Sequence, residues 1–161
     1  MSSQVLSSQP SLNALDAWVR LLRGHAAATR ELSARLVAEH GLTINDYECL
    51  LHLSRAELRA LRRVDLAELL ILTPSGVTRL LDGLERAGWV EKRSCDTDAR
   101  VTYAALTDAG LRKLEEASSD HIAAVRELFE ERFSGPELAK LAELLGRLPE
   151  AAAPADSCSP P

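Results

Sequence analysis

Two stretches of this chain are the most informative about its fold: residues 73–88, TPSGVTRLLDGLERAG, and residues 98–110, DARVTYAALTDAG. In the first stretch, Thr73 and Pro74 are typical of a helix start, because a threonine side chain caps the helix and proline needs no backbone N–H there. Gly88 suits a left-handed residue just past the helix end. The sequence therefore predicts one helix between Thr73 and Gly88.

The predicted helix stands between a shorter helix and a β-hairpin. Upstream, residues 65–70 carry leucines at helical spacing, and Asp65 with Glu68 is typical of a capping box. Downstream, residues 90–93 and 101–105 have the alternation of two strands around a polar turn. A short helix, a tight turn, a second helix and a hairpin make a winged helix-turn-helix, an arrangement that reads DNA.

Long amphipathic helices are predicted on both sides of this motif. Gly41 ends the first of them, Thr43 and Asp46 form a capping box for the next, and an extended link over residues 62–64 leads into the motif. The chain is therefore mainly α-helical, with one small hairpin. The apolar periodicity places the helices at residues 12–38, 43–60, 65–70, 73–88, 107–132 and 138–148.

Composition excludes several classes of protein. The chain has 161 residues, 46% of them hydrophobic and 27% charged, which indicates one globular domain. Its apolar runs are too short to cross a membrane, and residues 1–10 have no signal-peptide pattern. Three scattered cysteines argue against a disulfide framework, so we expect a cytoplasmic protein.

A net charge of −5 does not by itself favour a nucleic-acid partner, because phosphates repel an acidic protein. The acidic excess is concentrated at residues 101–161, whereas residues 55–100 contain nine basic and eight acidic side chains. The dense arginine groups of the chain lie in this near-neutral centre. A DNA-binding surface must therefore be sought there.

The helix predicted at 73–88 has an apolar face and a polar face. Its polar side chains have the size and the hydrogen-bonding groups that base edges and phosphates require, and Gly76 lets the backbone approach closely. An ordinary solvated helix face explains the same pattern about equally well. The outward-facing residues are Ser75, Thr78, Arg79, Asp82 and Arg86.

The hairpin favours DNA binding, because basic side chains gather near its tip. Lys92, Arg93 and Arg100 flank the turn, and an arginine in a minor groove senses its narrow, negative channel. Asp98 lies two residues before Arg100 and can hold its guanidinium by a charge-assisted hydrogen bond. A solvated turn is the alternative interpretation.

The two stretches in series resemble the MarR family of multiple-antibiotic-resistance-type regulators. Residues 98–110 fit its D-x-R-x5-L-T-x-x-G wing signature, and residues 66–88 are similar to its helix-turn-helix. The resemblance covers about residues 12–148. It implies a homodimeric, sequence-specific regulator that binds double-stranded DNA, which we expect to be a repressor on a palindromic operator.

The resemblance also implies a division of the chain. In the family, the first helix and the last two helices of each subunit interlock, and the outer helices of this chain are rich in leucine and alanine. We expect a disordered N-terminal segment at 1–11, a dimerisation helix at 12–40, a winged helix-turn-helix lobe at 43–106, dimerisation helices at 107–148 and a disordered tail at 149–161.

The DNA contacts of the family transfer to this chain position by position. Recognition helices enter successive major grooves, and the wings flank them in minor grooves. By this resemblance Ser75, Thr78 and Arg79 face bases, while Thr73 and Arg86 contact phosphates. The wing residues expected at DNA are Lys92, Arg93, Ser94, Asp98 and Arg100.

Many members of the family release DNA when they bind a small anionic aromatic ligand. A urate-responsive branch uses a tryptophan on the first helix, with an acidic residue and an arginine seven apart on the second. Trp18, Glu48 and Arg55 stand at comparable places and form a candidate ligand site. For Trp18 we favour packing in the core over ligand binding.

Redox and metal sensing have weaker support. Peroxide-sensing members carry a cysteine near the start of the first helix, where this chain has none. Cys49 lies in an apolar helix and is interpreted as a core residue, whereas Cys95 has basic neighbours and is the candidate for oxidation. The four histidines have no metal-ligand spacing, so we expect neither a metal nor a cofactor.

Two other classes of protein explain the sequence less well. An enzyme lacks support because the chain has no phosphate-binding loop, zinc-protease motif or nucleophile elbow. A winged helix that binds only a protein partner suits the negative net charge. Such a surface would present aromatic side chains, however, and the recognition face has none.

Overall fold

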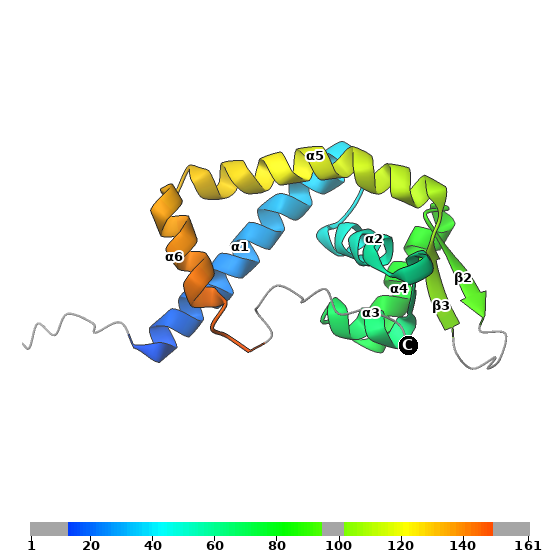
Figure 1. Ribbon diagram of the computed structural model, residues 1–161, viewed down its shortest axis with the longest axis horizontal. Helices are drawn as coiled ribbons and strands as arrows, with labels where there is room; N and C mark the ends of the chain where they lie inside the picture. Colours follow the sequence, from blue (N-terminus) through cyan, green and yellow to red (C-terminus); the bar gives the residue numbers. More distant parts are fainter. Residues whose placement is uncertain (1–12, 95–101, 150–161) are drawn as a thin grey trace, which may run out of the picture.

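The computed structural model describes residues 13–94 and 102–149, which are mainly helical (Figure 1). The winged helix-turn-helix expected from the sequence is confirmed, with α3 and α4 as its two helices and β2 and β3 as the wing. The helices are α1 (Ala14–His40), α2 (Ile44–Arg55), α3 (Arg63–Leu69), α4 (Pro74–Arg86), α5 (Asp108–Glu130) and α6 (Gly135–Leu145), with a 3-10 turn, η1, at Glu57–Arg59. The strands are β1 (Ala60–Arg62), β2 (Val90–Ser94) and β3 (Thr102–Leu106).

Side chains cap the helices at positions that the sequence indicates. Thr43 and Asp46 form the capping box of α2, with the N–H of Asp46 donating to Oγ1 of Thr43 at 3.2 Å. Thr73 accepts from the N–H of Gly76 at 3.1 Å, and Pro74 takes the first turn of α4. Each cap satisfies a backbone donor that the helix itself cannot, which is worth about 1 kcal/mol.

The sheet has three strands where the sequence predicts two. β3 lies in the middle and pairs antiparallel with β2 on one side and β1 on the other. Ala60 of β1 lies opposite Ala105, and Val90 of β2 lies opposite Leu106. A strand of three residues is too short to show an alternating pattern in the sequence. Because a lone hairpin is only marginally stable, β1 supports the wing.

Two boundaries next to β1 also differ from the expectation. α2 ends at Arg55, short of its predicted end, and α3 begins at Arg63, inside the stretch predicted to be an extended link. The capping box expected from Asp65 and Glu68 is wrong, because the helix begins before Asp65. That carboxylate instead accepts two hydrogen bonds from the guanidinium of Arg62, at 2.8 and 2.6 Å.

The core of the lobe lies where α2, α4, α5 and the sheet meet. α4 contributes Val77, Leu81 and Leu84, none of which is more than 2% exposed. α2 contributes Cys49, which is fully buried, so its interpretation as a core residue is confirmed. Burial of such side chains, worth about 2 kcal/mol for each large one, fixes the side of α4 that faces the protein.

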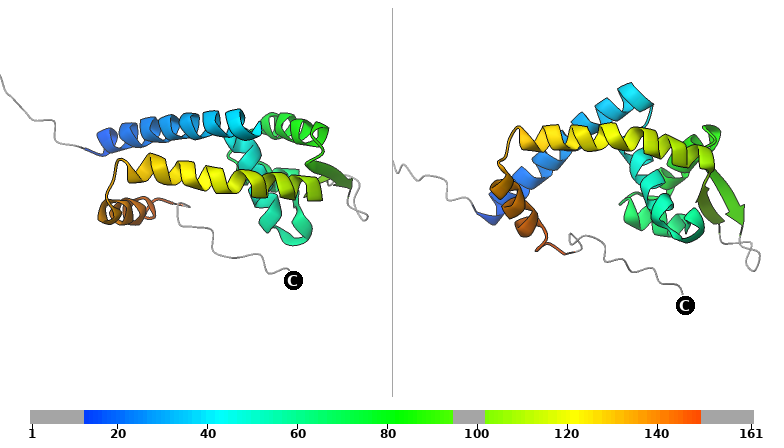
Figure 2. Two further views of the ribbon diagram at one scale, coloured as in Figure 1. Left: turned by 90° about the horizontal axis from the view of Figure 1, so that it is seen from above. Right: turned by 45° about the horizontal axis from the view of Figure 1, so that its top comes forward.

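An arm extends from this lobe (Figures 1 and 2). It consists of α1, the C-terminal part of α5, α6 and the short segments that follow α5 and α6. α1 packs against α5 through Leu32, Ala124 and Leu128, and an ion pair of 2.5 Å joins Arg35 to Glu127. The arm leaves large apolar side chains exposed, namely Leu15, Trp18, Val19, Leu22, Ile122, Phe133, Leu144 and Leu148.

Trp18 lies in the first turns of α1, near its N-terminus. It is 55% exposed, so the expectation that it packs in the core of this chain is wrong. Among the described residues, none of the helices has the length and apolar character of a membrane span. The terminal segments expected to be disordered, 1–11 and 149–161, lie outside the described residues except for Pro149.

Candidate nucleic-acid interface

The outward face of α4 is the candidate DNA-reading surface. Because Val77, Leu81 and Leu84 hold the opposite side against the core, the helix cannot rotate to hide its polar residues. Three of the sequence-predicted residues are exposed and the other two are half-buried. The exposed ones are Ser75, Arg79 and Arg86, and the half-buried ones are Thr78 and Asp82.

Hydroxyl groups at the start of α4 are already engaged within the protein. Oγ1 of Thr73 caps the helix and lies 3.2 Å from Oγ of Ser75. Oγ1 of Thr78 donates to the carbonyl oxygen of Pro74 at 2.9 Å. A hydroxyl has only one proton to donate, so Thr78 can offer a ligand its acceptor capacity alone. A Cβ at Gly76 would lie 3.2 Å from Oγ1 of Thr73, which makes this a close-packed turn.

The two arginines of α4 are held differently. Nε of Arg86 donates to the carbonyl oxygen of Asp82 at 3.0 Å, which draws its side chain back along the helix. Within the described part of the chain, Arg79 forms no ion pair. Its exposed guanidinium therefore keeps its donors for an external acceptor, such as a base edge or a phosphate.

The basic side chains of β2 are paired with carboxylates. Nζ of Lys92 lies 3.0 Å from Oε2 of Glu85 and 3.4 Å from Oδ1 of Asp82, both on α4. The hydrogen bonds that Lys92 donates to the carboxylates of Glu85 and Asp82 raise its pKa. Arg93 lies 2.7 Å from a carboxylate oxygen of Glu91. Lys92 therefore ties the wing to the recognition helix, and its charge is partly compensated before any DNA approaches.

The tip of the wing lies outside the described residues. That part of the chain includes Asp98 and Arg100, predicted to act at the minor groove, and Cys95, the candidate for oxidation. Ser94 is the last residue of β2, and its backbone lies opposite Thr102 of β3. The strands that carry the tip are thus in register on both sides of it.

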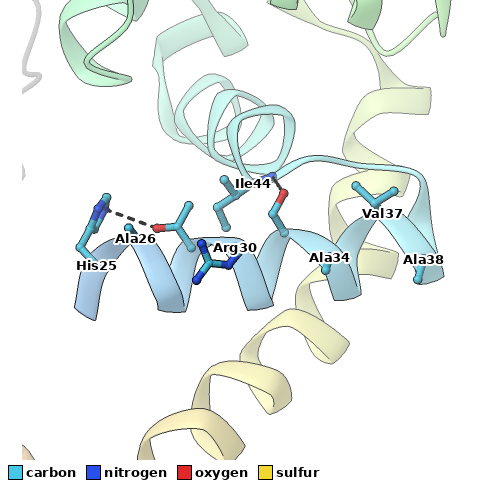
Figure 3. A pocket seen from close by; sticks show the side chains of 9 residues that line it. His25, Ala26, Arg30, Ala34, Val37, Ala38 and Ile44 are labelled. Carbon is cyan, nitrogen blue, oxygen red and sulfur yellow. Dashed lines mark hydrogen bonds between the residues drawn. The ribbon is translucent and has the colours of Figure 1, made fainter. Parts of the chain in front are cut away.

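A groove along α1, beside the start of α2, is the candidate ligand site (Figure 3). Its volume is about 790 Å³. Alanine, valine and isoleucine side chains make most of its wall, and Arg30 supplies a cation. The residues that line it are His25, Ala26, Thr29, Arg30, Ser33, Ala34, Val37, Ala38 and Ile44.

The ligand residues predicted from the sequence do not line this groove. Trp18 lies on the same helix but nearer its N-terminus, and Glu48 and Arg55 lie on α2. The charges of Glu48 and Arg55 both affect the pKa of His52, which lies between them in the sequence. Burial lowers the pKa of His52, Glu48 raises it and Arg55 lowers it further. Glu48 and Arg55 therefore share His52 as a neighbour on α2, and Trp18 lies on a different helix.

One cluster joins α1 to α5 outside these surfaces. Nε2 of His40 lies 3.0 Å from Oδ2 of Asp120, and Glu39 offers a carboxylate within 4.8 Å of both. Three such groups could each offer one ligand atom to a cation. This grouping is not visible in the sequence, because His40 and Asp120 are 80 residues apart. In the structure, the hydrogen bond of His40 to Asp120 serves as a contact between the two helices.

Cys49 is expected to be chemically inert in the folded protein. Burial raises the pKa of its thiol to about 12, so at pH 8 only about one molecule in ten thousand carries the reactive thiolate. In a Cys95→Ser/Cys158→Ser variant, Cys49 should react with an aromatic disulfide reagent at least about 100-fold more slowly than after unfolding in guanidinium chloride. Equal rates before and after unfolding would contradict this burial.

The fold and the arginine-bearing face of α4 define a winged helix-turn-helix protein. The family model described as MarR family matches residues 40–101. The crystal structure of AbsC, a MarR family transcriptional regulator from Streptomyces coelicolor, superimposes with a TM-score of 0.72 and 30% identity, covering 83% of this chain and 91% of AbsC. The chain therefore belongs to the MarR family of transcriptional regulators.

Two further relatives support this assignment. Sco3205, a MarR family regulator from Streptomyces coelicolor solved in complex with DNA, has a TM-score of 0.74 and 26% identity over 86% of this chain and 88% of its own. The transcriptional repressor YetL of Bacillus subtilis is 31% identical over 69% of this chain and 66% of its own. The family resemblance seen in the sequence is confirmed, and these relatives are regulators rather than enzymes.

Proposed function

We propose that this regulator binds a palindromic DNA operator as a homodimer and represses transcription from it. The observation that carries the proposal is the outward face of α4, where Arg79 is exposed on a helix whose other side is buried. A helix so held can enter a major groove with its arginine directed at base edges. With DNA as its partner, the protein acts in the cytoplasm.

In this proposal each predicted residue has one role at DNA. Ser75, Thr78 and Arg79 face bases, Thr73 and Arg86 lie at phosphates, and Gly76 allows the close approach of the backbone. Arg100, braced by Asp98, enters the minor groove. Lys92, Arg93 and Ser94 form the flank of the wing. The ion pairs of Lys92 suggest that it chiefly positions the wing.

The arm is proposed as the dimer interface. Its exposed apolar side chains are large and come from three helices and the segments beside them, and an exposed apolar surface of this kind is expected to be buried against a partner. A second copy of the same chain supplies the same surface around a two-fold axis. Two recognition helices related by that axis then require a palindromic site.

Leu22→Glu is expected to separate the dimer into monomers, because it puts a charge on the apolar face of α1. The wild-type protein should show twice the 17.5 kDa mass of the chain by light scattering, and the variant should show the single mass. Leu58→Glu is the control, since Leu58 is 83% exposed but lies in the lobe. If the Leu22→Glu variant were still a dimer, the arm would not be the dimer interface.

The DNA-binding proposal is tested with the DNA immediately upstream of the protein's own gene. We expect saturable binding that resists unrelated competitor DNA and weakens steeply as salt is raised, because bound cations are released from phosphates. If the protein binds this fragment and unrelated DNA equally and weakly, the next step is to select bound fragments from the whole genome. If selection also recovers no site, the lobe binds a protein partner instead.

Repression and ligand release complete the proposal. A reporter behind the selected operator should be expressed more strongly when the regulator is deleted, as expected of a relative of the transcriptional repressor YetL. A small anionic aromatic ligand suits the apolar groove with Arg30, because the ring would lie on its alanines and the anion would pair with the guanidinium. Benzoate is a suitable first probe, and it should weaken operator binding by the wild-type protein more than by Arg30→Ala.

A further inference from the structure

Arg63 is the first residue of α3, and its side chain reaches the recognition helix α4. Its Nη2 donates a hydrogen bond to Oγ1 of Thr78, a residue 15 positions further along the chain. Both residues are half-buried. This contact places the guanidinium of Arg63 on the polar face of α4, next to Thr78.

The charge of Arg63 is not compensated by any carboxylate in the described ranges, 13–94 and 102–149. Its neighbours behave differently, because Arg62 pairs with Asp65 at 2.6 Å and Arg59 pairs with Asp108 at 3.2 Å. A guanidinium has five N–H donors, and the bond to Thr78 uses one of them. Arg63 therefore combines a fixed position with donors that remain available for an anion.

We propose that Arg63 binds a phosphate of the DNA backbone, and that Thr78 is the positioning residue that directs its guanidinium. The proposal rests on the DNA-binding function proposed above. In helix-turn-helix proteins the first helix crosses the backbone while the second lies in the major groove, and α3 is the first helix here. The planar guanidinium matches two phosphate oxygens at once.

This assignment changes the role of Thr78. Its proton goes to the carbonyl oxygen of Pro74, and one of its lone pairs accepts from Arg63. The hydroxyl is thus largely used in holding Arg63, with little left for a base edge. Thr78 then influences DNA binding mainly through the arginine that it holds.

Arg63→Gln is the decisive variant, because glutamine can still donate to Thr78 but carries no charge. Binding is measured on a site that the wild-type protein selects from genomic DNA, across a range of salt concentrations. We expect at least about tenfold weaker binding at physiological salt. The slope of log K against log salt should fall by about 1.8, since a dimer loses two phosphate contacts. Arg112→Ala is the control, as it removes an exposed charge on α5.

Each outcome decides the proposal. Weaker binding, a lower salt slope and an unchanged melting temperature for Arg63→Gln, with wild-type values for Arg112→Ala, support the phosphate contact. Thr78→Val should weaken binding by about fivefold while keeping the salt slope, because the loosened arginine retains its charge. An unchanged slope for Arg63→Gln, or a loss confined to one base pair, overturns the phosphate contact. A wild-type protein that selects no DNA at all refutes the proposed function itself.

Discussion

Gly110→Ala is expected to destabilise the protein by about 3 kcal/mol, the cost of forcing extra volume into a packed site. A Cβ at Gly110 would lie 2.1 Å from the carbonyl oxygen of Trp89 and 2.8 Å from Cδ1 of Leu106. The nearest atom belongs to the backbone, so a side-chain rotation cannot relieve the overlap. The same carbonyl accepts the N–H of Thr107 at 3.1 Å, and Thr107 caps α5 through the N–H of Gly110. Thermal unfolding should show a melting temperature lower by about 10 °C.

Gly83→Ala is the matched control. Gly83 lies inside α4, and a Cβ there would meet nothing within 4 Å. Alanine is the better helix former by about 1 kcal/mol, so this variant should unfold at the wild-type temperature or slightly above it. If the Gly110→Ala and Gly83→Ala variants had equal free energies of unfolding, Gly110 would not lie as close to the backbone of Trp89 as the structure places it.

Arg79→Ala is expected to weaken operator binding by about 10- to 100-fold and to relax the preference for one base pair in each half-site. The physical reason is that Arg79 is exposed on α4, so its guanidinium can donate two hydrogen bonds to the acceptors of a guanine in the major groove. The measurement is affinity for a set of operators in which every base pair of one half-site is changed in turn. The wild-type protein should discriminate at one position where the variant does not.

Arg79→Lys separates base reading from charge. Lysine keeps the positive charge but cannot form the planar, two-pronged contact, so sequence preference should fall while binding to unrelated DNA stays close to that of the wild type. If Arg79→Ala weakened binding equally on every sequence, Arg79 would be a phosphate contact. In that case the base-reading role would pass to other residues on the outward face of α4.

Short-range signals explain why so much of the fold can be predicted from the sequence. The signals that start α2 and α4 act within one helical turn, so both starts can be predicted from neighbouring residues. They are Thr43 with Asp46 for α2 and Thr73 with Pro74 for α4. Gly88 takes the left-handed conformation expected of it, with φ of 76°. The buried Val77 and Leu84 confirm the apolar face, because helical spacing alone places both on one side.

The errors occur where a neighbour in space overrides a local signal. Asp65 and Glu68 have the spacing of a capping box, yet Asp65 binds Arg62 and the helix begins at Arg63. Trp18 has the position of a core residue on an amphipathic helix, yet the described part of one chain leaves it 55% exposed. Both cases depend on which element packs alongside, which the local pattern does not contain.

The order of residues is enough to predict a winged helix-turn-helix between long helices, because caps, turns and periodicity act over a few residues. It also singled out the outward face of α4, where the spacing of polar residues is visible without any contact. Three features become visible only when the chain is folded: β1 completes the sheet, Lys92 pairs with both Asp82 and Glu85, and Arg63 reaches Thr78. These contacts join residues that are far apart along the chain or on different elements, and packing of the elements against a shared core brings them together.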